Sequence, residues 1–119
     1  MMNVLPTEQE LGFLVGSILL QVCIGENEVI LRFSEEISIT IEARFVVRDS
    51  SGIETAFDDA RSAASSVVKL LSDTVATVNN LGGRTLRLIF SRGDILEIYG
   101  SNEGYESYQI QHGKEIFVV

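Results

Sequence analysis

Apolar and polar residues alternate between Glu28 and Arg48, and this pattern constrains the fold more than any other feature. The apolar side chains share odd-numbered positions: Val29, Leu31, Phe33, Ile37, Ile39, Ile41, Ala43, Phe45 and Val47. Successive side chains of a β-strand point to opposite faces, so the pattern predicts strands over 28–33 and 37–47 with one buried face. A three-residue turn, 34–36, would set Phe33 opposite Ile37 and keep both apolar faces together.

The spacing becomes helical between Thr55 and Val75. One stripe collects the apolar residues of this segment: Phe57, Ala60, Ala63, Ala64, Val67, Leu70, Leu71 and Val75. Two capping-box spacings are available, Ser51 with Glu54 and Thr55 with Asp58. We therefore expect one main helix over about residues 55–74.

Alternation returns after the helix, over 86–98, and two short strands follow at 106–111 and 115–119. Thr7 and Glu10 have capping-box spacing, which predicts a short helical turn before a strand in 17–24. The segments 29–41 and 86–98 match at an offset of 57 residues. This repeat indicates either a duplication or two hairpins of similar pattern. The fold class expected is α+β: an antiparallel sheet of two meanders, about six to eight strands, with the one main helix packed on it.

Size and charge limit the classes of protein. The chain has 119 residues, enough for a single domain spanning 1–119, and carries 17 acids against 9 bases, a net charge of −8. Phosphate would repel such a chain, so no nucleic-acid partner is expected. Residues 1–10 lack the basic start of a secretory signal, and the longest apolar stretch, Leu11–Ile24, is shorter than a membrane span. With Cys23 as its lone cysteine, we expect a cytoplasmic protein without a membrane anchor.

Residues suited to catalysis are sparse. His112 is the one imidazole and lies in a predicted turn, while Cys23 has no flanking cation to activate it. One His and one Cys cannot form a zinc set, and neighbouring acids diverge on a strand or helix. The glycines at 82–83 and 100–104 do not precede a helix, as a phosphate loop would. We predict no catalytic residue, metal or cofactor, and a binding protein rather than an enzyme.

The negative charge is concentrated in the first half. Residues 1–60 carry eleven acids and three bases, whereas residues 61–119 carry six of each. The expected register places Glu28 across from Glu42, and like charges so placed are unfavourable. Such an acidic surface attracts a cationic partner. The residues predicted to steer it are Glu28, Glu35, Glu36, Glu42 and Asp49.

The three tyrosines fall within ten residues, at 99, 105 and 108. Tyrosine gives a large contact area at low entropic cost. Tyr105 and Tyr108 are therefore predicted to pack against the partner.

Several segments together resemble a family of small uncharacterised bacterial proteins. They are Leu14-x-Gly16 with Leu20-x-Val22, Leu88-x-Phe90-Ser91-x-Gly93-x-x-Leu96-x-Ile98, Tyr105-Glu106-Ser107-Tyr108-x-Ile110 and Ile116–Val119. The resemblance covers most of the chain and implies no catalytic residues. In size, acidity and expected α+β make-up the chain is also similar in kind to immunity proteins of bacterial toxin systems.

These features favour an interaction protein, most concretely an immunity protein whose acidic face occupies a basic toxin domain. The alternative is a small ligand-binding domain or enzyme with a pocket between helix and sheet. A third interpretation is a homodimer formed through an exposed sheet edge or face.

Overall fold

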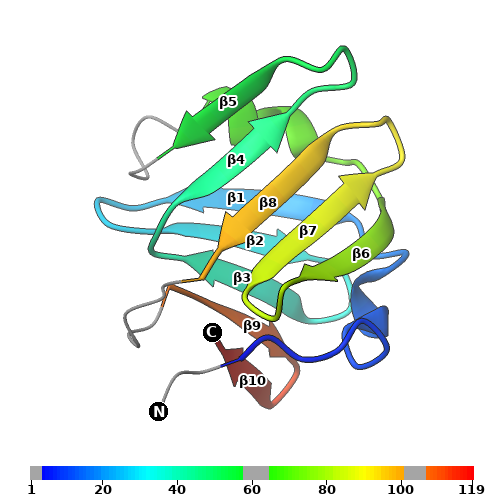
Figure 1. Ribbon diagram of the computed structural model, residues 1–119, viewed down its shortest axis with the longest axis vertical. Coiled ribbons are helices and arrows are strands. Elements are labelled where there is room, and N and C mark those ends of the chain that lie inside the picture. Colours follow the sequence, from blue (N-terminus) through cyan, green and yellow to red (C-terminus); the bar gives the residue numbers. More distant parts are fainter. Residues whose placement is uncertain (1–3, 58–64, 101–106) are drawn as a thin grey trace.

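Two five-stranded antiparallel sheets form the protein (Figure 1). The structure is a computed structural model that describes residues 4–57, 65–100 and 107–119. Sheet 1 has the order β1-β2-β3-β9-β10 and sheet 2 the order β5-β4-β8-β7-β6. Sheet 1 contains β1 (Leu19–Ile24), β2 (Val29–Phe33), β3 (Ile37–Ile41), β9 (Tyr108–His112) and β10 (Glu115–Val118). Sheet 2 contains β4 (Phe45–Arg48), β5 (Glu54–Phe57), β6 (Val75–Leu81), β7 (Thr85–Phe90) and β8 (Ile95–Tyr99).

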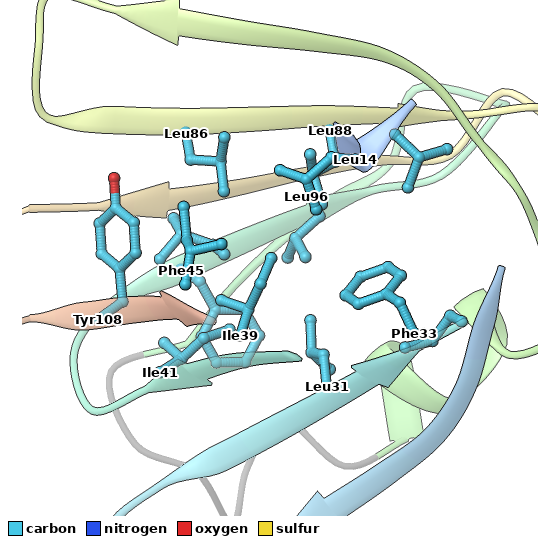
Figure 2. Packing of buried hydrophobic residues seen from close by; sticks show 14 of the residues in the cluster. Leu14, Leu31, Phe33, Ile39, Ile41, Phe45, Leu86, Leu88, Leu96 and Tyr108 are labelled. Carbon is cyan, nitrogen blue, oxygen red and sulfur yellow. The ribbon is translucent and has the colours of Figure 1, made fainter. Parts of the chain in front are cut away.

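The core lies between the two sheets. Figure 2 shows Leu31 and Ile39 of sheet 1 directed toward Leu88 and Leu96 of sheet 2. All four side chains are fully buried and belong to one hydrophobic cluster. A β-sandwich of this kind buries one face of each sheet and leaves the other exposed, which explains the alternation along most strands.

The predicted register of the first hairpin is confirmed. Phe33 pairs with Ile37 and Leu31 pairs with Ile39, across a turn at 34–36. The predicted strand 37–47, however, is two strands. The chain leaves sheet 1 after Ile41 and enters sheet 2 at Phe45. Alternation continues through this corner because the inner faces of both sheets look onto the same core.

The predicted α+β class and the main helix over about 55–74 are wrong. The described residues are mostly β, and Glu54–Phe57 is a strand, β5, paired with β4. After it, the described part of the segment holds one helical turn at 65–67 and a 3₁₀ turn, η2 (Val68–Leu70), before β6. Residues 58–64 lie outside the described ranges.

Local hydrogen bonds explain why no helix starts at Ser51. The Asp49 carboxylate accepts hydrogen bonds from the Ser51 N–H and hydroxyl and from the Ile53 N–H, which closes a β4–β5 hairpin instead of a capping box. The helical stripe nevertheless contains four buried residues, while its alanines at 60, 63 and 64 lie outside the described residues. Phe57, Val67, Leu70 and Val75 are all in the core.

The sandwich contains a structural repeat, which matches the repeat in the sequence. Strands β1, β2 and β3 form three neighbours of sheet 1, and β6, β7 and β8 form three neighbours of sheet 2. The hairpin that follows each trio crosses to the other sheet: β4–β5 joins β8, and β9–β10 joins β3. The fold is thus two five-stranded halves that have exchanged their last hairpins.

Reciprocal hydrogen bonds where the halves meet make the repeat precise at the level of single residues. Gly16 N–H donates to the Val75 carbonyl, and Ser72 N–H donates to the Leu19 carbonyl, both at 2.8 Å. Each trio also begins with a bulge at the same place, between Leu19 and Gln21 in one and between Val75 and Thr77 in the other. Thr7 and Glu10 form the predicted capping box ahead of η1 (Gly12–Leu14), the counterpart of η2.

The repeat predicts two stabilising substitutions. Ser72 (φ 68°) and Glu36 (φ 59°) have left-handed backbones, and the equivalent positions of the other half are glycines, Gly16 (φ 89°) and Gly93 (φ 97°). A left-handed conformation costs a non-glycine residue about 1 kcal/mol, part of which the greater entropy of unfolded glycine offsets. We expect Ser72→Gly and Glu36→Gly each to raise the free energy of unfolding by about 0.5 kcal/mol. Urea unfolding measures this. The comparison variant Ser34→Gly, at a position without positive φ, should lower it.

Candidate functional site

Three glutamates gather at one end of sheet 1. Val29 pairs with Ile41, so Glu28 and Glu42, the residues just outside that pair, are side by side. They line an open groove of about 400 Å³ together with Gly25, Glu26 and Asn27. We call Glu26, Glu28 and Glu42 the acidic corner. Among the described residues that line this groove none is basic, and the carboxylates of Glu28 and Glu42 give it negative potential open to solvent.

The other predicted acids lie elsewhere. Glu35 and Glu36 occupy the β2–β3 turn at the opposite end of sheet 1, where both have left-handed backbones. Glu36 lines a second open groove, of about 330 Å³, with Arg32, Phe33, Ile37, Ser38, Gln111 and Gly113. The β1–β2 turn is at the left of Figure 1 and the β2–β3 turn at the right. Glu35 and Glu36 are therefore separated from Glu28 and Glu42 by the length of strands β2 and β3.

Asp49 belongs to a third place, the β4–β5 turn at the top of Figure 1. Its carboxylate accepts the hydrogen bonds that close the turn. The Ser51 hydroxyl and the Ile53 N–H lower the pKa of this carboxyl below its usual value. Asp49 is thus a turn-forming residue, remote from the acidic corner.

Tyr108 lies in the core and is 2% exposed, so it is not available to pack against a partner in this structure. Figure 2 shows its ring within the hydrophobic cluster. Its hydroxyl donates to the Arg84 carbonyl at 2.8 Å, and burial raises the pKa of this tyrosine. Tyr105, the other predicted anchor, lies outside the described residues.

A polar network on the outer face of sheet 2 was not identified from the sequence. Glu97 is 9% exposed, and its carboxylate accepts a hydrogen bond from the Tyr99 hydroxyl at 3.1 Å. The guanidinium groups of Arg48 and Arg87 lie 3.9 and 3.8 Å from it, and Arg48 also pairs with Glu54 at 2.7 Å. Burial and the Glu97 carboxylate raise the pKa of Tyr99. The alternation in 95–99 could have revealed this network. Leu96 and Ile98 face the core, so Glu97, which lies between them, must face outward.

Groups suited to catalysis are engaged in packing. The ring of His112, which the sequence placed in a turn, lies at the end of β9 and stacks on Phe13 with a centroid distance of 4.3 Å. Cys23 is a half-buried free thiol in β1. Within the described ranges, no group of three or more His, Cys, Asp or Glu side chains is placed to hold a metal ion.

The cavity between the short helical segment and sheet 2 is small. Its lining includes Ser66 and Lys69 on one side and Val47 and Thr55 on the other. Its volume of about 20 Å³ accommodates roughly one water molecule. This cavity, which described residues line at the place where the sequence suggested a pocket, is too small for a substrate.

The fold and this site define a β-sandwich with an acidic corner at one end of one sheet. In comparisons with known proteins, no family model, no curated protein and no solved structure matches the chain. No helix of the described residues has the length and apolar character that crossing a membrane requires.

Proposed function

We propose that this protein is an interaction module that binds a basic protein partner through the acidic corner. One observation carries the proposal: Glu28 and Glu42 lie side by side on one open groove that Glu26 also lines, and no described residue of its walls is basic. A lysine or arginine side chain of a partner that enters this groove would meet the neighbouring carboxylates of Glu28 and Glu42. The mechanism is occlusion and electrostatic steering, and it requires no reaction on this chain.

The register supports a binding role for the corner, because it makes the corner unfavourable for stability. Glu28 and Glu42 are neighbours on adjacent strands, and like charges in such positions cost some tenths of a kcal/mol. Neither forms an ion pair with any other described residue. Contact with a cationic side chain would relieve this repulsion, so binding gains both attraction and the removal of an unfavourable pair.

The more specific form of the proposal is a bacterial immunity protein acting in the cytoplasm, with a toxin domain as its partner. Toxin domains that act on nucleic acids or other anions need a cationic site, and an acidic corner is complementary to it. The small size and acidity of the chain and its single cysteine support this interpretation, whereas the expected α+β make-up, which the structure contradicts, does not. The revised contact set is smaller than the one predicted, because Glu35, Glu36, Asp49 and Tyr108 lie away from the corner.

Neutralising the corner tests the proposal. The triple variant E26Q/E28Q/E42Q should bind the partner about tenfold more weakly, because exposed charges at an interface contribute about 0.5 kcal/mol each. The loss should appear in the association rate and should shrink at high salt. The partner to use is the product of the neighbouring gene, co-expressed and co-purified, with affinity and rates then measured by surface plasmon resonance.

The matched control is E35Q/E36Q/E115Q, which removes the same charge from exposed positions at the opposite end of sheet 1. We expect this variant to bind within twofold of the wild type. Equal losses in the two triple variants would show that only net charge matters and would overturn the assignment to the corner. Absence of co-purification, together with no protection of cells from the neighbouring gene product, would overturn the immunity function.

A further inference from the structure

The outer face of sheet 1 carries a charge pattern that is complementary to itself. Its central side chains are uncharged: Cys23, Ile30, Thr40, Gln109 and Val118. At one end of the face lie Glu28 and Glu42, and at the other end lies Arg32. Glu28 and Arg32 are each two residues from Ile30 along β2, so opposite charges flank a neutral centre at equal distances, about 6.6 Å.

The equivalent face of sheet 2 has the reverse arrangement. The counterparts of Ile30 and Thr40 in the repeat are Arg87 and Glu97, which are paired across β7 and β8. On the outer face of sheet 2 the opposite charges of Arg87 and Glu97 therefore lie at the centre and form an ion pair within the chain. On sheet 1 they are terminal, and Arg32, an exposed side chain, forms no ion pair with any described residue.

We propose that the outer face of sheet 1 binds a second copy of this chain. A two-fold axis lying in the interface, perpendicular to the strands and passing over Ile30, would place β2 antiparallel to β2 of the other copy. Arg32 of each copy then lies over Glu28 and beside Glu42 of the other, and the neutral centres meet. In a chain of net charge −8, this face lets two copies approach with attraction at both ends.

The contact area is modest. Five strands of five residues cover about 24 by 17 Å, which corresponds to a small interface and a reversible dimer. Exposed Ile116 (54%) at the β10 end adds apolar area to the same face. The dimer covers the acidic corner, so it would compete with a basic partner. The inference does not require that partner, because the purified chain alone tests it.

Charge reversal and restoration test the geometry. Sedimentation velocity over a wide concentration range should show a monomer–dimer equilibrium for the wild type. Arg32→Glu should weaken the dimer by tenfold or more, because it sets acid against acid at both ends. The triple variant R32E/E28R/E42R should restore it with the charges exchanged. The matched control is Arg92→Glu, which makes the same charge change on the exposed β7–β8 turn and should leave the dimer unchanged.

Cys23 provides a second readout of the same face. Its register partner is Ile30, so the proposed axis passes over it. Facing sheets pack about 10 Å apart, which brings the two thiols within reach of a short bis-maleimide but not of a disulfide. We expect a covalent dimer in the wild type and in the restored variant, and none in Arg32→Glu. A monomer at every concentration, a dimer indifferent to Arg32→Glu, or a dimer that does not cross-link through Cys23 would each overturn the proposal.

Discussion

Replacing Tyr108 by alanine is expected to lower the free energy of unfolding by about 3 to 5 kcal/mol, as for other large aromatic residues removed from a core. Tyr108 is 2% exposed, and its ring lies in the cluster between the sheets (Figure 2). Domains of this size have a total stability of about 5 to 15 kcal/mol, so this variant would be close to unfolding. Urea denaturation followed by circular dichroism measures the loss. A change below about 1 kcal/mol would show that the ring is not in the core.

Tyr108→Phe separates the ring from its hydroxyl. The hydroxyl donates to the Arg84 carbonyl, which also accepts from the Gly100 N–H at 3.0 Å and so keeps one partner in the variant. We therefore expect a smaller loss, about 1 kcal/mol. Because Tyr108 does not reach the acidic corner, partner binding should be unchanged in folded Tyr108→Phe.

The pH dependence of stability should distinguish the wild type from Tyr108→Phe. Burial raises the pKa of Tyr108 in the folded state above its ordinary value of about 10. The stability from this group is present below that ordinary value and is lost as the pH rises above it, because the unfolded chain then releases the proton first. Wild type should lose stability more steeply than Tyr108→Phe in alkaline solution. Tyr99, whose pKa is also raised, adds to the slope in both proteins.

The second large effect is expected at Asp73, which lies where the two halves of the repeat meet. Asp73 is 3% exposed. Its carboxylate accepts hydrogen bonds from the backbone N–H groups of Thr74, at 2.8 Å, and Arg92, at 3.3 Å. Asp73→Ala would remove the acceptor of both donors in a partly buried region. We expect the free energy of unfolding to fall by about 2 to 4 kcal/mol.

Two comparison variants sharpen the Asp73 prediction. Asp73→Asn keeps one acceptor oxygen and should cost less than Asp73→Ala. Ser17, the equivalent residue of the other half, is 2% exposed and donates to the Leu14 carbonyl at 2.6 Å. Ser17→Ala removes one neutral hydrogen bond and should cost about 1 kcal/mol. If Asp73→Ala and Ser17→Ala were equally destabilising, the carboxylate would have no special role in joining the halves.

Local pattern was sufficient for the hairpins. The register of β2 against β3 follows from the alternation, because a slip of one residue would put every isoleucine of β3 in water. The capping box at Thr7 and the buried residues of both meanders follow from equally local rules. The offset of 57 residues likewise reflects a real structural repeat.

The candidate site was predictable only in part. The juxtaposition of Glu28 and Glu42 follows from the hairpin register, so the sequence alone indicated it. The groove, the distance to Glu35 and Glu36, and the position of Asp49 depend on which turns meet in space. Tyr108 illustrates the difference: its period-two pattern with Ile110 fits an inward or an outward face, and the exchange of hairpins sets it inward.

The amino-acid sequence by itself determined the inward faces of β2 and β3, the turn between them and their register. Only the tertiary structure decided that β4–β5 and β9–β10 exchange sheets, that residues 54–57 form a strand, and that the acids divide among three corners. The physical reason is that both sheets present the same apolar face to one core. Alternation therefore specifies the side of a strand, while the choice of partner strand rests on contacts between residues far apart in the chain.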